Sequence, residues 1–385
     1  MSAVSAFPAR AVIDLAAVRS NVRVLAAHAG PAAVMAVVKA DGYGHGLVPM
    51  ARAALAGGAT WLGVAQLEEA FALREAGVQA PVLAWLYAPG APLGRALEAG
   101  IDLSVGAPWA LREVLDAARV TGRTARVHLK VDTGLGRGGA MPDQLDDLLD
   151  VALPAQAEGL CAVVGIFSHL AWADAPDHPT VLAQARVFDD AVATAERRGA
   201  RLEVRHLANS AATVTNPAMH YDLVRPGLAV TGLSPVPQIG DSAHFGLVPA
   251  MRLEAELVLT KQVAAGQGVS YAHAYTTPRA TVLGVVPMGY ADGIPRHASG
   301  TDERPGGPVL VGGRRLGIAG RVCMDQVVLD LGPGATEVAG DAVQLFGSGV
   351  DGEPTAQDWA ESAGTISYEI VTRLGARVPR VYVGG

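Results

Sequence analysis

Short apolar segments alternate with amphipathic segments over the first two-thirds of the chain. The amphipathic segments, such as 67–76, 107–119 and 181–198, carry apolar residues at the spacing of one helical face. Strands that alternate with helices form a parallel sheet, and eight such strands favour a closed (β/α)8, TIM-type barrel over the competing open, doubly wound sheet. The eighth strand is the weakest prediction, because the helix before it would be short. The predicted strands are 34–40, 61–65, 81–87, 101–105, 125–131, 163–169, 204–207 and 223–233.

The pattern changes after about residue 240, where Val/Leu/Gly segments replace the Ala-rich helices. Glycine pairs and prolines separate these segments, as turns require. One helix is expected at 355–363, since Thr355 can cap it and Asp358 suits its first turn. The sequence therefore predicts a barrel domain over 1–240 and a mostly-β domain over 241–385. The β segments are 251–259, 281–286, 309–311, 314–320, 326–331 and 342–346.

Composition narrows the class of protein. The chain has 385 residues, half of them hydrophobic, and a formal net charge of −7 without a Lys/Arg-rich run, which argues against a nucleic-acid partner. No apolar stretch is long enough to predict a membrane span, and the N-terminus lacks a secretory pattern, so we expect a cytoplasmic protein. Cys161 and Cys323 lie far apart and outside any Cys/His cluster, so neither a disulfide framework nor a metal site is expected.

Lysine is scarce, which simplifies the search for an amine nucleophile. The chain contains only Lys39, Lys130 and Lys261. Lys39 ends the first predicted strand and precedes the glycine-rich run Ala-Asp-Gly-Tyr-Gly-His-Gly. Burial of an ammonium lowers its pKa, and a neutral amine is what imine formation needs. The alternative is a lysine whose stem lies along the strand end while its amine reaches solvent.

Other polar residues follow the ends of later predicted strands. Each has an ordinary explanation by itself, such as a helix cap or a surface cation. Together they indicate one site at the carboxyl ends of the barrel strands, suited to an anionic, aromatic and phosphorylated ligand. The Asn209-Ser210 turn and the Gly227 backbone can supply phosphate donors. The full set is Lys39, Arg137, His169, His206, Asn209, Ser210 and Arg225.

Several longer motifs extend this pattern over nearly the whole chain. In the barrel half they are VVKADGYGHG at 37–46, VDTGLGR at 131–137, HLANSA at 206–211 and VRPGL at 224–228. In the second half they are VSY at 269–271, GYADG at 289–293, GRVCMD at 320–325 and TISYE at 365–369. With these motifs in this order, the chain resembles the bacterial alanine racemases.

The resemblance implies a reaction and an assembly. Lys39 would hold pyridoxal 5'-phosphate as a Schiff base and serve as one of two proton-transfer bases. Tyr271 of a partner subunit would be the other base, on the opposite face of the substrate Cα. The implied reaction interconverts L- and D-alanine on the external aldimine, in a homodimer with shared active sites. The product D-alanine would supply cell-wall peptidoglycan.

The resemblance also implies roles for the remaining site residues. Arg225 would face the pyridine nitrogen and leave it unprotonated, because a guanidinium keeps its own proton, and this disfavours transamination. His169 would form a hydrogen-bonded route with Arg225. Arg137 would bind the cofactor oxygen and, with Met324, the substrate carboxylate. Lys130 can be carbamylated in this family. The implied cofactor-binding residues also include Tyr43, Asn209, Ser210, Gly227, Leu228 and Tyr368, and the implied entrance residues are Tyr290 and Asp325.

Other functions compete with this interpretation. A protein that only carries pyridoxal phosphate needs no second base, so it would not explain the β domain with Tyr271. A fold-related decarboxylase would pair the ring nitrogen with an acidic residue, where this sequence has Arg225. A racemase for larger amino acids and a non-enzymatic structural protein complete the alternatives, and α-proton exchange across a panel of amino acids distinguishes them.

Overall fold

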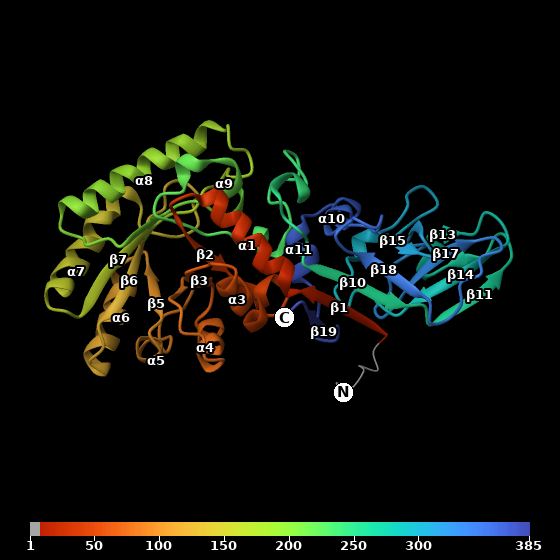
Figure 1. Ribbon diagram of the computed structural model, residues 1–385, viewed down its shortest axis with the longest axis horizontal. Helices are drawn as coiled ribbons and strands as arrows, with labels where there is room; N and C mark the ends of the chain where they lie inside the picture. The colour runs from red at the N-terminus through yellow and green to blue at the C-terminus, as the bar shows by residue number, and fades with distance from the viewer. Residues whose placement is uncertain (1–7) are drawn as a thin grey trace. The chain divides into compact units, whose positions relative to one another are not determined.

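The computed structural model describes residues 8–385, which fold into two compact units. The barrel unit comprises Val18–Gly42 and Leu47–Leu247. Within the described residues, the β unit comprises residues 8–17, Tyr43–Gly46 and Val248–Gly385. Figure 1 follows these segments along the chain from red to blue. Every helix in the described part of the chain is too short or too polar to span a bilayer.

The barrel unit is an eight-stranded parallel sheet whose strands alternate with helices. The order is β8-β7-β6-β5-β4-β3-β2-β9, and the Arg225 N–H donates to the Ala208 carbonyl at 2.9 Å between the two end strands. This confirms the predicted barrel. Its strands are β2 (Ala33–Val37), β3 (Trp61–Val64), β4 (Val82–Ala84), β5 (Asp102–Val105), β6 (Ala125–Lys130), β7 (Cys161–Phe167), β8 (Val204–His206) and β9 (Leu223–Val224).

Helices lie outside these strands, as α7 and α8 show beside β6 and β7 in Figure 1. The barrel helices are α1 (Leu15–Ala29), whose first residues belong to the β unit, α2 (Lys39–Tyr43), α3 (Leu47–Ala56), α4 (Leu67–Glu75), α5 (Leu93–Glu98), α6 (Pro108–Thr121), α7 (Leu145–Ala157), α8 (Pro179–Arg197) and α9 (Ser210–Thr215). As expected, the helix before the last strand, α9, is short. The last strand is also shorter than predicted, because the chain turns after Val224 and continues into a 3-10 helix at Leu228–Thr231.

Side chains from β8 and β9, the first and last strands in the sheet order, pack with side chains from the strands between them. Met35, Leu83 and Leu223 are fully buried and form one apolar cluster with Trp61 and Val204. These residues come from β2, β4, β9, β3 and β8, so the cluster ties the closing strands to the rest of the sheet. This core keeps the strand ends, and therefore the residues that follow them, in fixed places.

In the described part of the chain, the β unit contains three antiparallel or mixed sheets and the α-helices α10 and α11. Its six-stranded sheet has the order β16-β15-β18-β10-β1-β19, the three-stranded sheet β11-β14-β17, and the smallest β12-β13. The strands are β1 (Ala9–Asp14), β10 (Met251–Glu256), β11 (Leu259–Val263), β12 (Gly268–Val269), β13 (Tyr275–Thr276), β14 (Thr281–Val286), β15 (Pro308–Val311), β16 (Arg314–Gly317), β17 (Val327–Gly332), β18 (Ala342–Phe346) and β19 (Arg380–Val383). The helices are α10 (Ala356–Ala363) and α11 (Ser367–Thr372).

The first strand, β1, belongs to a different domain from the one in which the sequence placed it. β1 pairs antiparallel with β10 and parallel with β19, so it belongs to the sheet of the β unit rather than to the barrel. The predicted division at residue 240 placed this segment in the barrel domain. The chain instead passes from one unit to the other between Leu247 and Val248, and the N-terminal strand and Tyr43–Gly46 belong to the β unit.

Candidate functional site

A cavity of about 520 Å³ lies at the carboxyl ends of β2 to β6. Its walls include the cations Lys39, Lys130 and Arg137 and the aromatic residues Trp85 and Trp109. All of its lining residues belong to the barrel unit. A volume in this range suits a small organic ligand.

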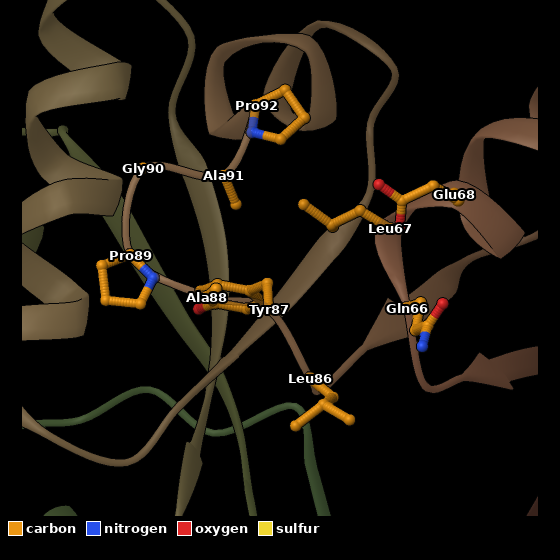
Figure 2. Close-up of a pocket in the computed structure, with 10 residues that line it drawn as sticks. All are labelled: Gln66, Leu67, Glu68, Leu86, Tyr87, Ala88, Pro89, Gly90, Ala91 and Pro92. Atoms are coloured by element: carbon orange, nitrogen blue, oxygen red, sulfur yellow. The ribbon is translucent and has the colours of Figure 1, made fainter.

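A second hollow, of about 640 Å³, adjoins this cavity and shares Leu86 and Tyr87 with it. It is lined by residues 66–68, at the start of α4, and by residues 86–92, in the loop that follows β4 (Figure 2). Its charged lining residue is Glu68, whereas the first cavity presents three cations. The first cavity is therefore the candidate site for an anionic ligand.

Lys39 lies two residues after the end of β2 and begins a strained stretch of backbone. Ala40, Asp41 and Tyr43 have φ values of 53°, 54° and 55°, a region that costs about 1 kcal/mol for each non-glycine residue. The Ala40 N–H donates to Glu69 Oε1 at 2.6 Å, which holds the start of this stretch. Burial, with the nearby Arg137 cation, lowers the pKa of Lys39, and Glu69 only partly opposes the shift. The prediction of a partly buried amine of lowered pKa is confirmed.

Asp132 shapes the loop that carries Arg137. Its Oδ1 accepts from the N–H groups of Gly134 and Leu135, both at 2.9 Å, and of Gly136 at 3.1 Å. Its Oδ2 accepts from the Arg137 N–H at 2.9 Å. Burial alone would raise the pKa of Asp132. The four backbone donors lower it by more, so the pKa lies below the ordinary value of an aspartate. The loop is therefore tied to an ionised carboxylate, and the Arg137 side chain faces the cavity.

Lys130 ends β6 and faces the same cavity. Burial lowers its pKa, and the cations Arg137 and Arg225 lower it further, while Asp132 raises it. Within residues 8–385, neither Lys39 nor Lys130 forms an ion pair. The cavity thus concentrates positive charge that the described residues do not neutralise.

Arg225 and His169 lie near this group of cations. Arg225 is 7% exposed, and burial lowers its pKa to about 9, so it is charged at neutral pH. Its Nη2 donates to the carbonyls of Ser168 at 2.7 Å and Leu207 at 3.3 Å. Burial, followed by the Arg225 and Arg137 charges, lowers the pKa of His169 to about 3. His169 is therefore a neutral imidazole beside a buried guanidinium.

Ser210 connects the turn after β8 with the turn after β9. Its Oγ, in a side chain that is 4% exposed, accepts from Gly227 N–H at 2.8 Å and from Ala229 N–H at 3.3 Å. Asn209 caps α9, where its Oδ1 accepts from the Ala212 N–H at 3.1 Å. The predicted residues Asn209, Ser210, Gly227 and Leu228 are thus brought together in the barrel unit.

Tyr43 and Tyr368 face one another in the β unit. Their ring centroids are 6.3 Å apart, at an interplanar angle of 53°. Gly44 makes this approach to α11 feasible, because a Cβ there would lie 2.1 Å from the Val371 carbonyl oxygen. The chain therefore passes from the barrel unit to the β unit directly after Gly42, a short distance beyond the end of β2.

Tyr271, Tyr290 and Met324 are exposed on adjoining loops of the β unit, at 67%, 40% and 53% respectively. Ser270 Oγ lies 3.3 Å from Cys323 Sγ, and the Tyr290 N–H donates to the Cys323 carbonyl at 3.0 Å. These contacts hold the three exposed residues in one surface, which we call the tyrosine platform. The predicted entrance residue Asp325 borders it and pairs with Arg377 at 2.7 Å.

The backbone under Tyr271 is also strained. Ser270, Ala272 and His273 have φ values of 61°, 57° and 46°. Ser270 Oγ donates to the Arg321 carbonyl at 2.7 Å, which anchors this turn. Tyr271 is therefore an exposed tyrosine on a strained, anchored turn, and such strain is common at functional positions.

Comparisons with known proteins identify the family. The alanine racemase N-terminal domain matches residues 13–235, and the alanine racemase C-terminal domain matches residues 250–382. The chain belongs to the alanine racemase family. Alanine racemases from Beutenbergia cavernae and Streptomyces coelicolor are 64% and 58% identical to it, over 98% and 97% of this chain and 99% and 96% of theirs.

Solved alanine racemases share the whole fold. That of D-cycloserine producing Streptomyces lavendulae is 54% identical, with a TM-score of 0.96 over 99% of this chain and 98% of that chain. The enzyme from Bacillus anthracis with bound L-Ala-P is 32% identical, with a TM-score of 0.90 over all of this chain and 97% of that chain. The resemblance inferred from the motifs is thereby confirmed.

Sequence reasoning missed three residues in or near the cavity. Asp132 lies in a quoted motif, and the glycines that follow it could have identified it as the anchor of a tight loop. Glu69 binds the N–H groups of Ala40 and Ala65, which follow different strands, and no local pattern predicts that contact. Trp85 follows β4, where the barrel pattern places site residues, but the predicted strand 81–87 ran past the end of β4 at Ala84 and so included Trp85.

Proposed function

We propose that this chain is an amino-acid racemase that interconverts L- and D-alanine with pyridoxal 5'-phosphate as its cofactor. One observation carries the chemistry: Lys39, an amine of lowered pKa, lines a ligand-sized cavity whose cations have no ion-pair partner among the described residues. Alanine as the substrate is supported by the relatives, which are named alanine racemase at up to 64% identity.

The residues around Lys39 fit a phosphorylated aromatic aldehyde. The cavity pairs aromatic walls with uncompensated positive charge, and the pKa of the Lys39 amine is lowered, as covalent attachment requires. When bound, the cofactor supplies an electron sink that acidifies the α-hydrogen of an attached amino acid. The proposed phosphate-binding residues are Tyr43, Asn209, Ser210, Gly227, Leu228 and Tyr368.

Arg225 favours racemisation over other reactions of this cofactor. We assign it to the pyridine nitrogen, with His169 beside it. A guanidinium can only donate there, and Arg225 is charged at neutral pH. With the cofactor bound, Arg225 would leave the ring nitrogen without a proton, and this would favour return of a proton to Cα over transamination. A decarboxylase that pairs this nitrogen with an acid is disfavoured for the same reason.

Two proton-transfer groups account for inversion at Cα. The Lys39 amine takes or returns the proton on one face of the substrate, and the Tyr271 hydroxyl does so on the other. Tyr271 is 67% exposed and belongs to the β unit, and we assign it to the site of a partner subunit. The active form is then a homodimer with shared active sites, in which Met324 contributes to substrate binding and Tyr290 and Asp325 line the entrance.

Lys130 is the proposed carbamylated lysine. Its lowered pKa favours the neutral amine, which adds CO2 and releases one proton. The resulting anion would lie among Arg137 and other cations and would orient the Arg137 guanidinium toward the substrate carboxylate. Carbon-13 NMR of protein in labelled bicarbonate should show one carbamate signal that is absent from Lys130→Gln and retained in Lys261→Gln.

Exchange of the α-proton tests the proposed function directly. Purified protein with added pyridoxal phosphate is incubated in D2O with both enantiomers of a panel of amino acids. We expect deuterium at Cα of L- and D-alanine at the highest rates, with inversion of each. Exchange without inversion, or faster turnover of larger amino acids, would contradict the proposal. Supply of D-alanine for peptidoglycan and a cytoplasmic location remain predictions from the sequence.

A further inference from the structure

A chain of buried polar side chains crosses the barrel unit behind Arg225. Arg225 Nη1 lies 3.1 Å from His206 Nδ1, and His206 Nε2 lies 2.9 Å from His128 Nδ1. His128 Nε2 in turn lies 3.3 Å from Asp102 Oδ2. Both imidazoles are fully buried, and Asp102 is 2% exposed. We call these four residues the imidazole chain.

The two ends of the imidazole chain fix the position of every proton between them. A guanidinium has no acceptor, so His206 Nδ1 must accept from Arg225 and the His206 proton must sit on Nε2. That proton points at His128 Nδ1, which must therefore accept as well. The His128 proton then sits on Nε2 and points at Asp102, whose carboxyl oxygen accepts it, as the other oxygen accepts from Arg126 Nε. Each N–H thus points from Arg225 toward Asp102.

The barrel strands are adapted to make room for this arrangement. His128 on β6 and His206 on β8 are separated by β7, where a Cβ at Gly165 would lie 2.2 Å from His128 Nδ1. The pairing of β6 with β7 also shifts register between Val127 and His128, so that His128 lies opposite Gly165. An irregular strand pairing and a side-chain-free position therefore coincide at the contact between the two imidazoles.

Neighbouring groups hold both ends of the imidazole chain in place. Arg126 Nε donates to Asp102 at 3.0 Å, and Arg126 also pairs with Glu203 at the surface. The Phe167 ring stacks on the His206 imidazole at 4.8 Å and 5°. Arg225 itself is fixed by the two carbonyl contacts of its Nη2. Among the described residues, three of its five N–H groups are thereby engaged, which leaves two for a ligand.

We propose that Asp102 is a positioning residue for the racemase: it fixes the tautomers of His128 and His206 and so holds Arg225 as a hydrogen-bond donor at the site. This inference rests on the proposed function, which assigns Arg225 to the pyridine nitrogen. Asp102 stands at the first residue of β5, and Arg225 follows β9. A residue near the amino ends of the strands therefore acts on chemistry at their carboxyl ends, through three hydrogen bonds that polarise one another.

The tautomers can be read without any measurement of activity. Protein labelled with 15N-histidine, with and without pyridoxal phosphate, is examined by long-range proton–nitrogen correlation NMR, and His128→Asn and His206→Asn assign the signals. We expect a neutral imidazole with its proton on Nε2 for both residues. A proton on Nδ1 of either histidine overturns the inference, whether or not the protein proves to be a racemase.

Asp102→Asn tests the effect on Arg225 with little change in size. Arg126 only donates, so the amide oxygen stays toward Arg126 and the amide NH2 turns toward His128, which reverses the favoured tautomers. We expect kcat to fall roughly tenfold in both directions, which corresponds to about 1.4 kcal/mol, with KM for alanine nearly unchanged and a shifted cofactor absorption band. Glu203→Gln removes only the ion pair of Arg126 at the surface. It should leave the tautomers of the two histidines, kcat and the cofactor absorption band unchanged. Lower stability of Asp102→Asn with normal tautomers and normal kcat would show that Asp102 is only structural and would overturn the proposal.

Discussion

In the barrel unit the predicted site residues line a cavity, whereas in the β unit they stand on an exposed surface. Lys39, Lys130 and Arg137 share walls of one cavity, and the first two have pKa values lowered by burial and by neighbouring cations. Tyr271 and Met324, by contrast, are more than half exposed on the tyrosine platform. The pKa values of the barrel lysines are shifted by their own surroundings, whereas Tyr271 is held on the surface by a strained, anchored turn.

This difference suggests what each region lacks. A cavity lined by cations without ion-pair partners among the described residues suits an anionic ligand, and the exposed tyrosine and methionine side chains are available for contact with another surface. In a two-fold dimer each platform can serve the cavity of the partner subunit. Variants of the cavity and variants of the tyrosine platform test these two inferences independently.

The largest effect is expected at Lys39. Lys39→Ala removes both the proposed covalent attachment and one proton-transfer group, so α-proton exchange should fall by at least about 10³-fold for both enantiomers. Lys261, on β11, is exposed and provides a matched control. Lys261→Ala should retain full exchange and the visible absorption band, and equal losses in the two variants would remove Lys39 from the mechanism.

The next effect is expected at Tyr271 and should depend on the enantiomer. Tyr271→Phe should slow proton abstraction from L-alanine by about 10²-fold or more, and from D-alanine much less, because the Lys39 amine still serves the other face. Tyr275→Phe is the matched control in the same unit, since its hydroxyl binds Asp330 at 2.6 Å. It should alter stability only. Equal losses for both enantiomers in Tyr271→Phe would contradict the two-base assignment.

Mixed dimers of Lys39→Ala and Tyr271→Phe test whether the platform of one subunit serves the cavity of the other. If Tyr271 serves the partner's cavity, a mixed dimer of Lys39→Ala and Tyr271→Phe contains one site with both defects and one intact site. Random reassembly of equal amounts should then restore about one quarter of wild-type activity. No recovery after verified subunit exchange would place both groups in the cavity of a single chain.

The sequence predicted the barrel and its strand-end residues because both depend on local patterns. Lys39 could be found from the end of one apolar segment. β1 could not be assigned to the β unit, because its partners, β10 and β19, lie more than 200 residues further along. His128 and His206 are 78 residues apart, and their contact depends on a shift in strand register. The strained turn at Tyr271 likewise depends on its anchor at Arg321, which no local pattern specifies.

A smaller effect is expected from pH, and it should arise in the barrel unit. The pKa of His169 is about 3 in the folded protein and about 6.5 when unfolded. Between these values only the unfolded chain binds the proton, so the free energy of unfolding falls as pH falls below about 6.5, by about 1.4 kcal/mol per pH unit for this group. The pKa of His206 is also far below its ordinary value, chiefly through burial, and adds in the same direction.

Urea unfolding at pH 6.5, 5.5 and 4.5 measures this slope. In His169→Gln the slope should decrease by the equivalent of one proton, while the change in stability at pH 7 reflects packing alone. A slope identical to that of the wild type would mean that His169 is protonated in the folded protein, and its assignment as a neutral imidazole would be wrong.

The smallest effect is expected at the cap of α10, in the β unit and apart from the tyrosine platform. Thr355 Oγ1 accepts from the Asp358 N–H at 3.1 Å, which is the cap that the sequence predicted, and the Thr355 N–H also donates to Asp358 Oδ2 at 2.8 Å. Thr355→Ala should cost about 1 kcal/mol, whereas Thr355→Ser keeps the hydroxyl and most of the stability. Trp359, buried in α10, is the tryptophan of the β unit, so its signal in fluorine NMR of 5-fluorotryptophan-labelled protein reports this loss during urea unfolding. Racemase turnover should stay unchanged, because the cap touches neither the cavity nor the tyrosine platform. A loss of turnover in Thr355→Ala without a change in the Trp359 signal would contradict this expectation.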